Sequence, residues 1–260
     1  VGGIVRLTRF ILKGTLLIEA AGAMLLLPVF VSDYGLKGIW MAAFHSVSAF
    51  CNAGFDILGT ADNAFPSLTG YSGNILINVV IMLLIITGGI GFLTWDDIYR
   101  NKMNFKRYRM QSKIILMTTV CLIVFPAFFF FACDLKNLPA GERLLAAMFQ
   151  SVTTRTAGFN TIDISEMSEA SKAVMILLML IGGSPGSTAG GMKTNYFYGT
   201  DSECNCNLSQ SGKCRGFWTE TGVSCDKKCS HNSYALFYII LLWRCCNQRI
   251  RRSSPFGLSV

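Results

Sequence analysis

Long apolar runs alternate with short ones along most of this chain. A helix needs ~20 apolar residues to cross a bilayer, and three runs reach that length, at residues 10–31, 74–94 and 114–133. A fourth run begins at residue 172 and stops being a good helix after residue 181, where glycine becomes frequent. The pattern predicts an all-α membrane protein whose spanning elements are helices.

Two shorter runs, residues 38–50 and 141–152, each lie between two of the long runs. At about a dozen residues they are too short to span. They also repeat one another, because Phe-x-Ser-Val and Ala-Gly-Phe align between residues 44–56 and 149–160 with one residue of slip. Each copy ends on a small-residue turn, Ala53, Gly54 and Phe55 in the first and Ala157, Gly158 and Phe159 in the second. Glycine permits a positive φ and a close approach of backbone. We therefore expect two re-entrant pore loops that turn carbonyl groups toward an ion path.

The distribution of charge supports a membrane class and sets an orientation. Only 15% of the residues are charged, whereas about a quarter are charged in soluble domains. Basic residues gather in the loop between the second and third runs and before the first run: Arg100, Lys102, Lys106, Arg107, Arg109 and Lys113, and Arg6, Arg9 and Lys13. Short loops rich in lysine and arginine face the cytoplasm. We expect the N-terminus and the 100–113 loop to be cytoplasmic, and nucleic acid is not an expected partner.

A glycine-rich loop follows the fourth run. It consists of Gly182, Gly183, Ser184, Pro185, Gly186, Ser187, Thr188, Ala189, Gly190 and Gly191. Irregular backbone is tolerated at membrane depth only where it is buried in protein or lines a water-filled cavity. We expect a flexible intramembrane loop. A phosphate-binding loop is excluded, because Met192 stands before Lys193 where that motif requires glycine.

Polar side chains that stand alone within the apolar runs are expected to have structural roles. A carboxylate inside a span, such as Glu19, faces protein or water, and we expect it to make a helix-packing contact. His45 is expected to pack within its short helix. Arg155 would repel a cation beside an ion path, so we expect it to point away and pair with Asp163 or Glu166. No Ser/His or Cys/His catalytic arrangement is present, and an enzyme is not expected.

Four motifs together resemble the membrane subunit of the Ktr/Trk potassium-uptake family. They are Ser-Val-Ser-Ala-Phe-Cys-Asn-Ala-Gly-Phe-Asp (46–56), Gly-Gly-Ile-Gly-Phe with Trp-Asp-Asp (88–97), Ser-Val-Thr-Thr-Arg-Thr-Ala-Gly-Phe-Asn-Thr (151–161) and the run that ends Gly-Gly-Met-Lys-Thr (182–194). The resemblance covers residues 1–194 and implies four helix–pore-loop–helix repeats around one potassium path. It implies that Gly54 and Gly158, with their neighbours, are filter residues, and that residues 182–191 are a gating loop.

The same resemblance divides the chain. Residues 1–99 resemble the family's second repeat, residues 100–113 form the basic cytoplasmic loop, and residues 114–194 resemble the third repeat. Residues 195–260 carry no family motif and are expected to be irregular. Since the first repeat is absent and Val1 is not methionine, we expect a fragment that does not function alone.

The family resemblance further implies what the protein handles and where. The transported ion would be potassium, with sodium as a second candidate, and no cofactor is implied. The expected partners are membrane lipid, a second copy of the chain and a cytoplasmic nucleotide-binding regulatory subunit, and the expected location is the cell membrane.

The last quarter of the chain allows two readings. It holds seven of the ten cysteines, at positions 204, 206, 214, 225, 229, 245 and 246. One reading is translation out of frame, because codons chosen for residues 193–197, 216–220 and 242–256 yield family-like sequence in a shifted phase. The other is a membrane-anchored metal-binding or redox protein, in which Cys225 and Cys229 have the spacing nearest to that of zinc ligands.

Overall fold

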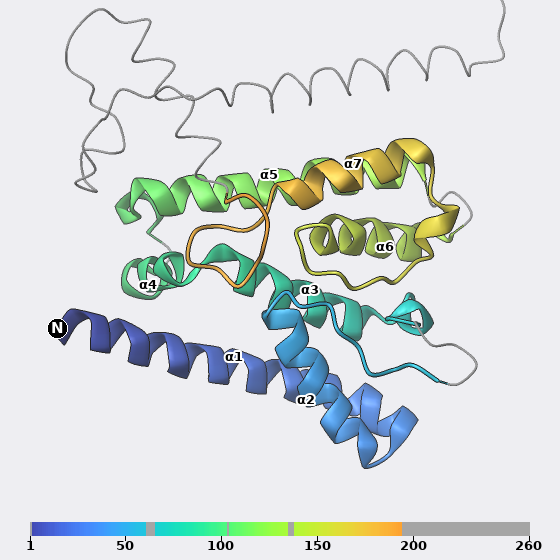
Figure 1. Cartoon of the computed structure of the whole chain (residues 1–260), viewed down its shortest axis with the longest axis horizontal. Coiled ribbons are helices and arrows are strands. Elements are labelled where there is room, and N and C mark those ends of the chain that lie inside the picture. The colour runs from blue at the N-terminus through green and yellow to red at the C-terminus, as the bar shows by residue number, and fades with distance from the viewer. Residues whose placement is uncertain (1, 61–65, 103, 135–137, 194–260) are drawn as a thin grey trace, which may run out of the picture. The chain divides into compact units, whose positions relative to one another are not determined.

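The computed structural model describes residues 2–60, 66–102, 104–134 and 138–193 (Figure 1). Within these ranges the regular elements are helices, apart from one isolated β-bridge between Ile181 and Met192. The expectation of an all-α protein is therefore confirmed for the described part of the chain. The predictions for residues 195–260 lie outside the described residues.

Among the residues that the structure describes, two helices are each long and apolar enough to cross a membrane. The first, α1, runs Gly2–Tyr34 and the other, α5, runs Met110–Cys133. They contain the predicted runs 10–31 and 114–133. A helix the length of α1 extends about 50 Å at 1.5 Å per residue, more than the ~30 Å hydrocarbon core.

The second predicted span is not one straight helix. The helix α3 (Ile75–Ile90) ends where α4 (Phe92–Asn101) begins, and the two meet at 98°. The prediction of a single segment over 74–94 is wrong at its C-terminal end. The break lies at Gly91, whose φ of +93° cannot continue an α-helix. The glycine-rich loop supplies the hydrogen bonds that the helix loses there, since Ser184 N–H donates to Gly89 O (3.1 Å) and Phe92 N–H donates to Gly186 O (3.0 Å).

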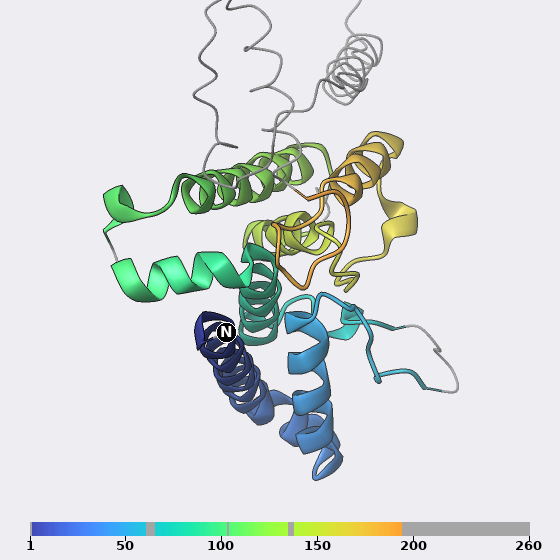
Figure 2. The same ribbon diagram turned by 60° about the vertical axis from the view of Figure 1, so that its left-hand side comes forward.

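The two predicted short helices are present. They are α2 (Lys37–Phe50) and α6 (Ala140–Thr153). Contacts join α2 to α1 and α3, and join α6 to α5 and α3 (Figure 2). The last helix, α7 (Glu169–Leu180), begins at Ser168, whose side chain accepts from Ser171 N–H, and it ends where the predicted fourth run loses its helical pattern.

Three short 3₁₀ turns complete the regular structure of the described residues. They are η1 (Thr69–Tyr71), η2 (Phe105–Arg107) and η3 (Ile164–Glu166).

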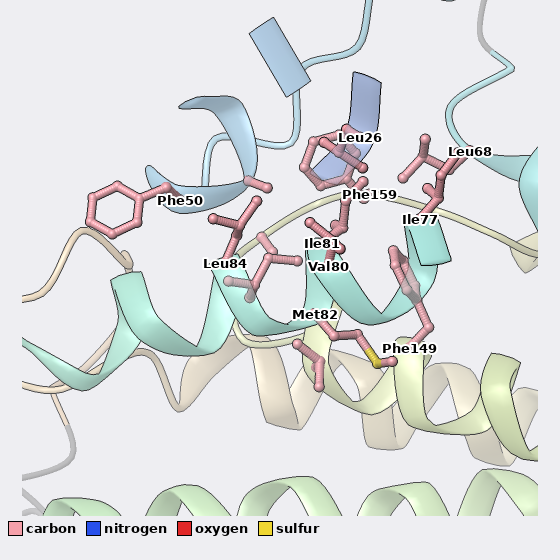
Figure 3. Packing of buried hydrophobic residues seen from close by; sticks show 14 of the residues in the cluster. Leu26, Phe50, Leu68, Ile77, Val80, Ile81, Met82, Leu84, Phe149 and Phe159 are labelled. Carbon is pink, nitrogen blue, oxygen red and sulfur yellow. The ribbon is translucent and has the colours of Figure 1, made fainter. Parts of the chain in front are cut away.

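The larger of two hydrophobic clusters among the described residues is centred on α3, which contacts both short helices. One face of α3 buries Ile77, Ile81 and Leu84 against side chains from other elements. Those side chains include Leu26 and Phe30 of α1, Phe50 of α2, Phe149 of α6 and Phe159 (Figure 3). Because α3 contacts both α2 and α6, it fixes the two short helices relative to one another.

Buried Asp97 fastens α4 to the start of α5. Its carboxylate accepts from Arg109 N–H (3.2 Å) and Ser112 Oγ (2.5 Å), and pairs with the Arg109 guanidinium at 3.3 Å. A carboxylate at a helix N-terminus also interacts favourably with the helix dipole. This contact holds the basic 100–113 loop as a closed connection between α4 and α5.

Adjacent glycines in α3 make a matched test of this packing. A Cβ on Gly88 would collide with the Phe50 carbonyl and lie 2.7 Å from Thr188 Oγ1, whereas a Cβ on Gly89 would meet nothing within 4 Å. We predict that Gly88→Ala lowers the free energy of unfolding by about 1–3 kcal/mol. Gly89→Ala should leave it unchanged or raise it by up to about 1 kcal/mol, because alanine favours helix.

Unfolding of the purified protein in detergent, followed by circular dichroism, measures both values. Equal effects of the two substitutions would contradict the packing of α3 against the C-terminus of α2.

Candidate functional site

The chain leaves both short helices through turns of the same unusual backbone. After α2, Asn52 (φ +51°) and Gly54 (φ +71°) are left-handed, and after α6, Thr156 (φ +67°) and Gly158 (φ +91°) are left-handed. In each copy the alanine between them has an ordinary negative φ. We call residues 51–55 the first glycine turn and residues 155–159 the second.

A hydroxyl group in the last turn of each helix fastens its glycine turn. Ser48 Oγ donates to Phe55 O at 2.7 Å, and Thr153 Oγ1 donates to Phe159 O at 2.5 Å. The helix backbone adds a second bond in each copy, from Ala53 N–H to Ser48 O and from Ala157 N–H to Thr153 O. Sequence reasoning missed these two hydroxyl groups, although Phe-x-Ser-Val-Ser/Thr repeats them at the same position.

The two glycine turns meet although they are about a hundred residues apart in sequence. A Cβ on Gly54 would collide with Ala157 O and lie 2.9 Å from Gly158 Cα, and a Cβ on Gly158 would lie 3.5 Å from Gly54 Cα. The fold thus brings Gly54, Ala157 and Gly158 together. A side chain is sterically excluded at Gly54, whereas at Gly158 the positive φ is what favours glycine.

The phenylalanines that follow the two glycines differ. Phe159 is fully buried, and its ring lies 6.3 Å from that of His45 in α2. Phe55 is 69% exposed. His45 itself is buried, stacks on Phe30 at 5.1 Å, and donates through Nδ1 to Met41 O, so it packs as expected.

Arg155 does not make the predicted ion pair. Its side chain is 4% exposed and Nη2 donates to Thr119 Oγ1 of α5 at 3.4 Å. Asp163 and Glu166 are exposed residues in and beside η3, and Asp163 accepts from Ser165 N–H instead. The prediction was wrong because the second glycine turn directs Arg155 inward against α5, away from the surface that carries both acids.

The glycine-rich loop, residues 182–191, lies against both glycine turns and the break in α3. Thr188 Oγ1 donates to Phe50 O at 2.8 Å, and Gly190 N–H donates to Thr156 Oγ1 at 2.9 Å. Thr188 N–H donates to Gly88 O, and the Ser184 hydroxyl donates to Gly89 O at 2.9 Å. Figure 1 shows the loop in orange between α7 and the break. The two glycine turns and the glycine-rich loop therefore lie in one region.

The loop is also closed on itself. Gly182 N–H donates to Met192 O and Gly183 N–H donates to Gly190 O. A Cβ on Gly182 would collide with Gly190 O, and one on Gly183 would lie 2.5 Å from the Ala189 Cβ. Small residues are needed here because the two arms of the loop touch. The Lys193 ammonium then donates to Ala189 O at 2.6 Å.

Comparisons with known proteins agree on one family. The family model TrkH, described as cation transport protein, matches residues 1–258. The potassium/sodium uptake protein NtpJ of Enterococcus hirae is 40% identical over 198 residues, which cover 74% of this chain and 42% of that protein. The Ktr system potassium uptake protein B of Bacillus subtilis is 36% identical over 204 residues, which cover 76% of this chain and 44% of that protein.

A solved structure shares the fold. The potassium transporter TrkH from Vibrio parahaemolyticus superposes with a TM-score of 0.61 at 18% identity, over 94% of this chain and 49% of that one. This chain thus spans less than half the length of the relatives it matches.

These matches concern membrane-embedded ion transporters and not enzymes. They give no support to a metal-binding or redox protein. The repeated glycine turns, the apolar helices and the matches agree: the chain belongs to the TrkH family of cation transport proteins.

Proposed function

We propose that this chain supplies two segments of a potassium filter and takes part in potassium uptake across the cell membrane, with sodium as a second candidate ion. The observation that carries the proposal is the meeting of Gly54 and Gly158, from different repeats, within backbone of alternating handedness. Potassium gives up its hydration shell only where backbone carbonyl groups replace it. The filter residues would be Ala53, Gly54 and Phe55, with Ala157, Gly158 and Phe159.

The electrostatics of the two short helices support a cation. Each glycine turn follows directly on the C-terminus of α2 or α6. A helix carries about half a negative charge at its C-terminus, so both turns lie where a cation is favoured. The nearby cation, Arg155, is bound to Thr119 of α5.

The glycine-rich loop is proposed as the gate of this path. It lies against both glycine turns through Thr188 and Gly190. Displacement of residues 182–191 would uncover both turns together. We propose that the loop lies on the cytoplasmic side of the filter, with the N-terminus and the basic 100–113 loop also cytoplasmic.

Two segments do not enclose an ion, and we propose that others complete the ring. We propose that residues 1–99 and 114–194 act as two of four repeats, and that the working transporter is a homodimer in lipid with a cytoplasmic nucleotide-binding subunit. The names of the Bacillus subtilis relatives, Ktr system potassium uptake proteins B and D, identify those proteins as parts of a system.

Residues 195–260 are proposed to be translated out of frame. The two relatives reported above align over 74% and 76% of this chain, a share close to that of residues 1–194. The family model, however, extends to residue 258.

The tail proposal predicts a result at the level of the gene. We expect resequencing around the codons for Lys193, Thr194 and Asn195 to reveal one surplus nucleotide, whose removal restores family sequence downstream. A confirmed reading frame, together with about one zinc per purified chain that is lost on mutating Cys225 and Cys229, would contradict the proposal and favour a real cysteine-rich tail.

A chimera tests the filter directly. The residues of Enterococcus hirae NtpJ that align with this chain are replaced by this chain's own, and the chimera is expressed in cells that lack other potassium uptake. We predict that Gly54→Ala and Gly158→Ala each reduce the initial rate of potassium uptake at least about tenfold, because alanine is strained at a positive φ and a Cβ on Gly54 would collide with Ala157 O.

Gly70→Ala is the matched control. Gly70 lies in η1, and a Cβ there would meet nothing within 4 Å. Uptake by this variant should equal that of the unaltered chimera. Normal uptake by the Gly54 and Gly158 variants, at equal amounts in the membrane, would exclude these glycines from the ion path.

The incomplete ring predicts that the 260-residue polypeptide does not conduct when it is the only transport protein present. Proteoliposomes that contain this chain should take up potassium no faster than protein-free vesicles, measured with a potassium-sensitive dye. Uptake above that background, abolished by Gly54→Ala, would show that two segments suffice.

A further inference from the structure

We propose that Asn52 and Thr156 are positioning residues that hold the glycine-rich loop closed, each from its own glycine turn. The inference rests on the proposed function, in which the turns form the filter and the loop forms the gate. It assigns a role to two side chains that are not themselves filter residues.

The two residues occupy equivalent places and make equivalent contacts. Each stands two positions before the glycine of its turn. Asn52 Nδ2 donates to Thr188 Oγ1 at 2.9 Å, and Thr156 Oγ1 accepts from Gly190 N–H at 2.9 Å. The loop is therefore bound at two points, two residues apart, by the two repeats.

Both residues have a backbone conformation that favours glycine. The φ angles are +51° at Asn52 and +67° at Thr156. Asparagine is one of the few residues other than glycine that adopt the left-handed region, whereas a β-branched residue such as threonine is a genuine outlier there. Glycine would adopt the same backbone without strain. The presence of threonine therefore indicates that its side chain has a use, and in both copies the side chain contacts the loop.

The environment makes the bond between Asn52 and Thr188 hard to replace, whereas the bond between Thr156 and Gly190 is exposed. Asn52 is 8% exposed, and Thr188 Oγ1 also donates to Phe50 O at the end of α2. Gly88 leaves the space that Thr188 occupies, since a Cβ there would lie 2.7 Å from Thr188 Oγ1. Water does not compete freely in such a site, and a buried polar group left without a partner is costly.

These contacts link the gate to the filter. The residues that bind the loop also set the left-handed steps of the two turns. When the loop leaves, Asn52 and Thr156 keep their backbone strain and lose the bonds that offset it. Opening of the loop therefore loosens the backbone of both filter segments, so that gate and filter change together.

Hydrogen–deuterium exchange on the full 260-residue chain in detergent micelles tests the proposal. The readout is the exchange rate of the Ser184 and Thr188 amides, which donate to Gly89 O and Gly88 O and are not altered by the substitutions. Loss of one hydrogen bond, worth about 0.5–1.5 kcal/mol, should raise the rate of loop opening. We expect Asn52→Gly and Thr156→Val each to speed this exchange about twofold to tenfold. In the double variant the increase in rate should equal the product of the two single increases.

Asn52→Gly is the decisive variant because a purely structural role predicts the opposite result. Glycine relieves the strain at φ +51°, so exchange would then stay the same or become slower. Lys102→Gly is the matched control, since Lys102 has a φ of +49° at the far end of α4. Lys102→Gly should leave the exchange rates of the Ser184 and Thr188 amides unchanged. Thr156→Ser keeps the hydroxyl group and should restore the slow exchange.

Unchanged or slower exchange in both Asn52→Gly and Thr156→Val would overturn the proposal. If Thr156→Val does not give a monodisperse protein, Thr156→Ala takes its place, because it also removes the hydroxyl group that accepts from Gly190 N–H. The readout is independent of ion flux. Faster exchange in the variants together with a chimera that takes up no potassium would support the role of Asn52 and Thr156 in holding the loop and would reject the transport function. Unchanged exchange together with an active chimera would reject only the role of these two residues.

Discussion

The structure depends on the need to satisfy every backbone polar group without water. In the bilayer, irregular backbone survives only where the protein itself supplies partners. The chain has two irregular segments that meet this need for one another. The break at Gly91 frees carbonyl groups at the end of α3, and Ser184 and Thr188 donate N–H groups to Gly89 O and Gly88 O. The glycine-rich loop in turn receives Phe92 N–H at Gly186 O. Neither irregularity would be stable alone.

Comparison of the two short helices and their glycine turns shows which hydrogen bonds occur in both copies and where the residue that makes them differs. Ser48 and Thr153 make the same bond to the carbonyl after the glycine. Asn52 and Thr156 bind the same loop, one as donor and the other as acceptor. The conserved feature between the two copies is the bond, and the side chain that makes it differs. The glycines do not vary in this way, because a side chain would collide at Gly54 and both glycines have a positive φ.

Hydrophobic pattern predicted the helices well, and the contacts between distant segments poorly. The short helices followed from their length, and the end of α7 followed from the accumulation of glycine after residue 181. The break at Gly91 could not be predicted, because Gly88 to Gly91 reads equally well as a packing patch within a span and its partners lie some ninety residues later. The direction of Arg155 depended on which way the second turn faces. The roles of Ser48 and Thr153 could not be predicted, because they depend on each glycine turn folding back onto the helix that precedes it.

The bend between α3 and α4 connects the glycine-rich loop to a part of the chain beyond the glycine turns. Gly186 is bonded to the first residue of α4, and the opposite end of that helix is fastened through Asp97 to the start of α5. A helix of ten residues spans about 15 Å, so α4 places the glycine-rich loop at one of its ends and the basic segment at the other. The loop and the basic segment are thus joined by one short helix that is hydrogen-bonded at both ends.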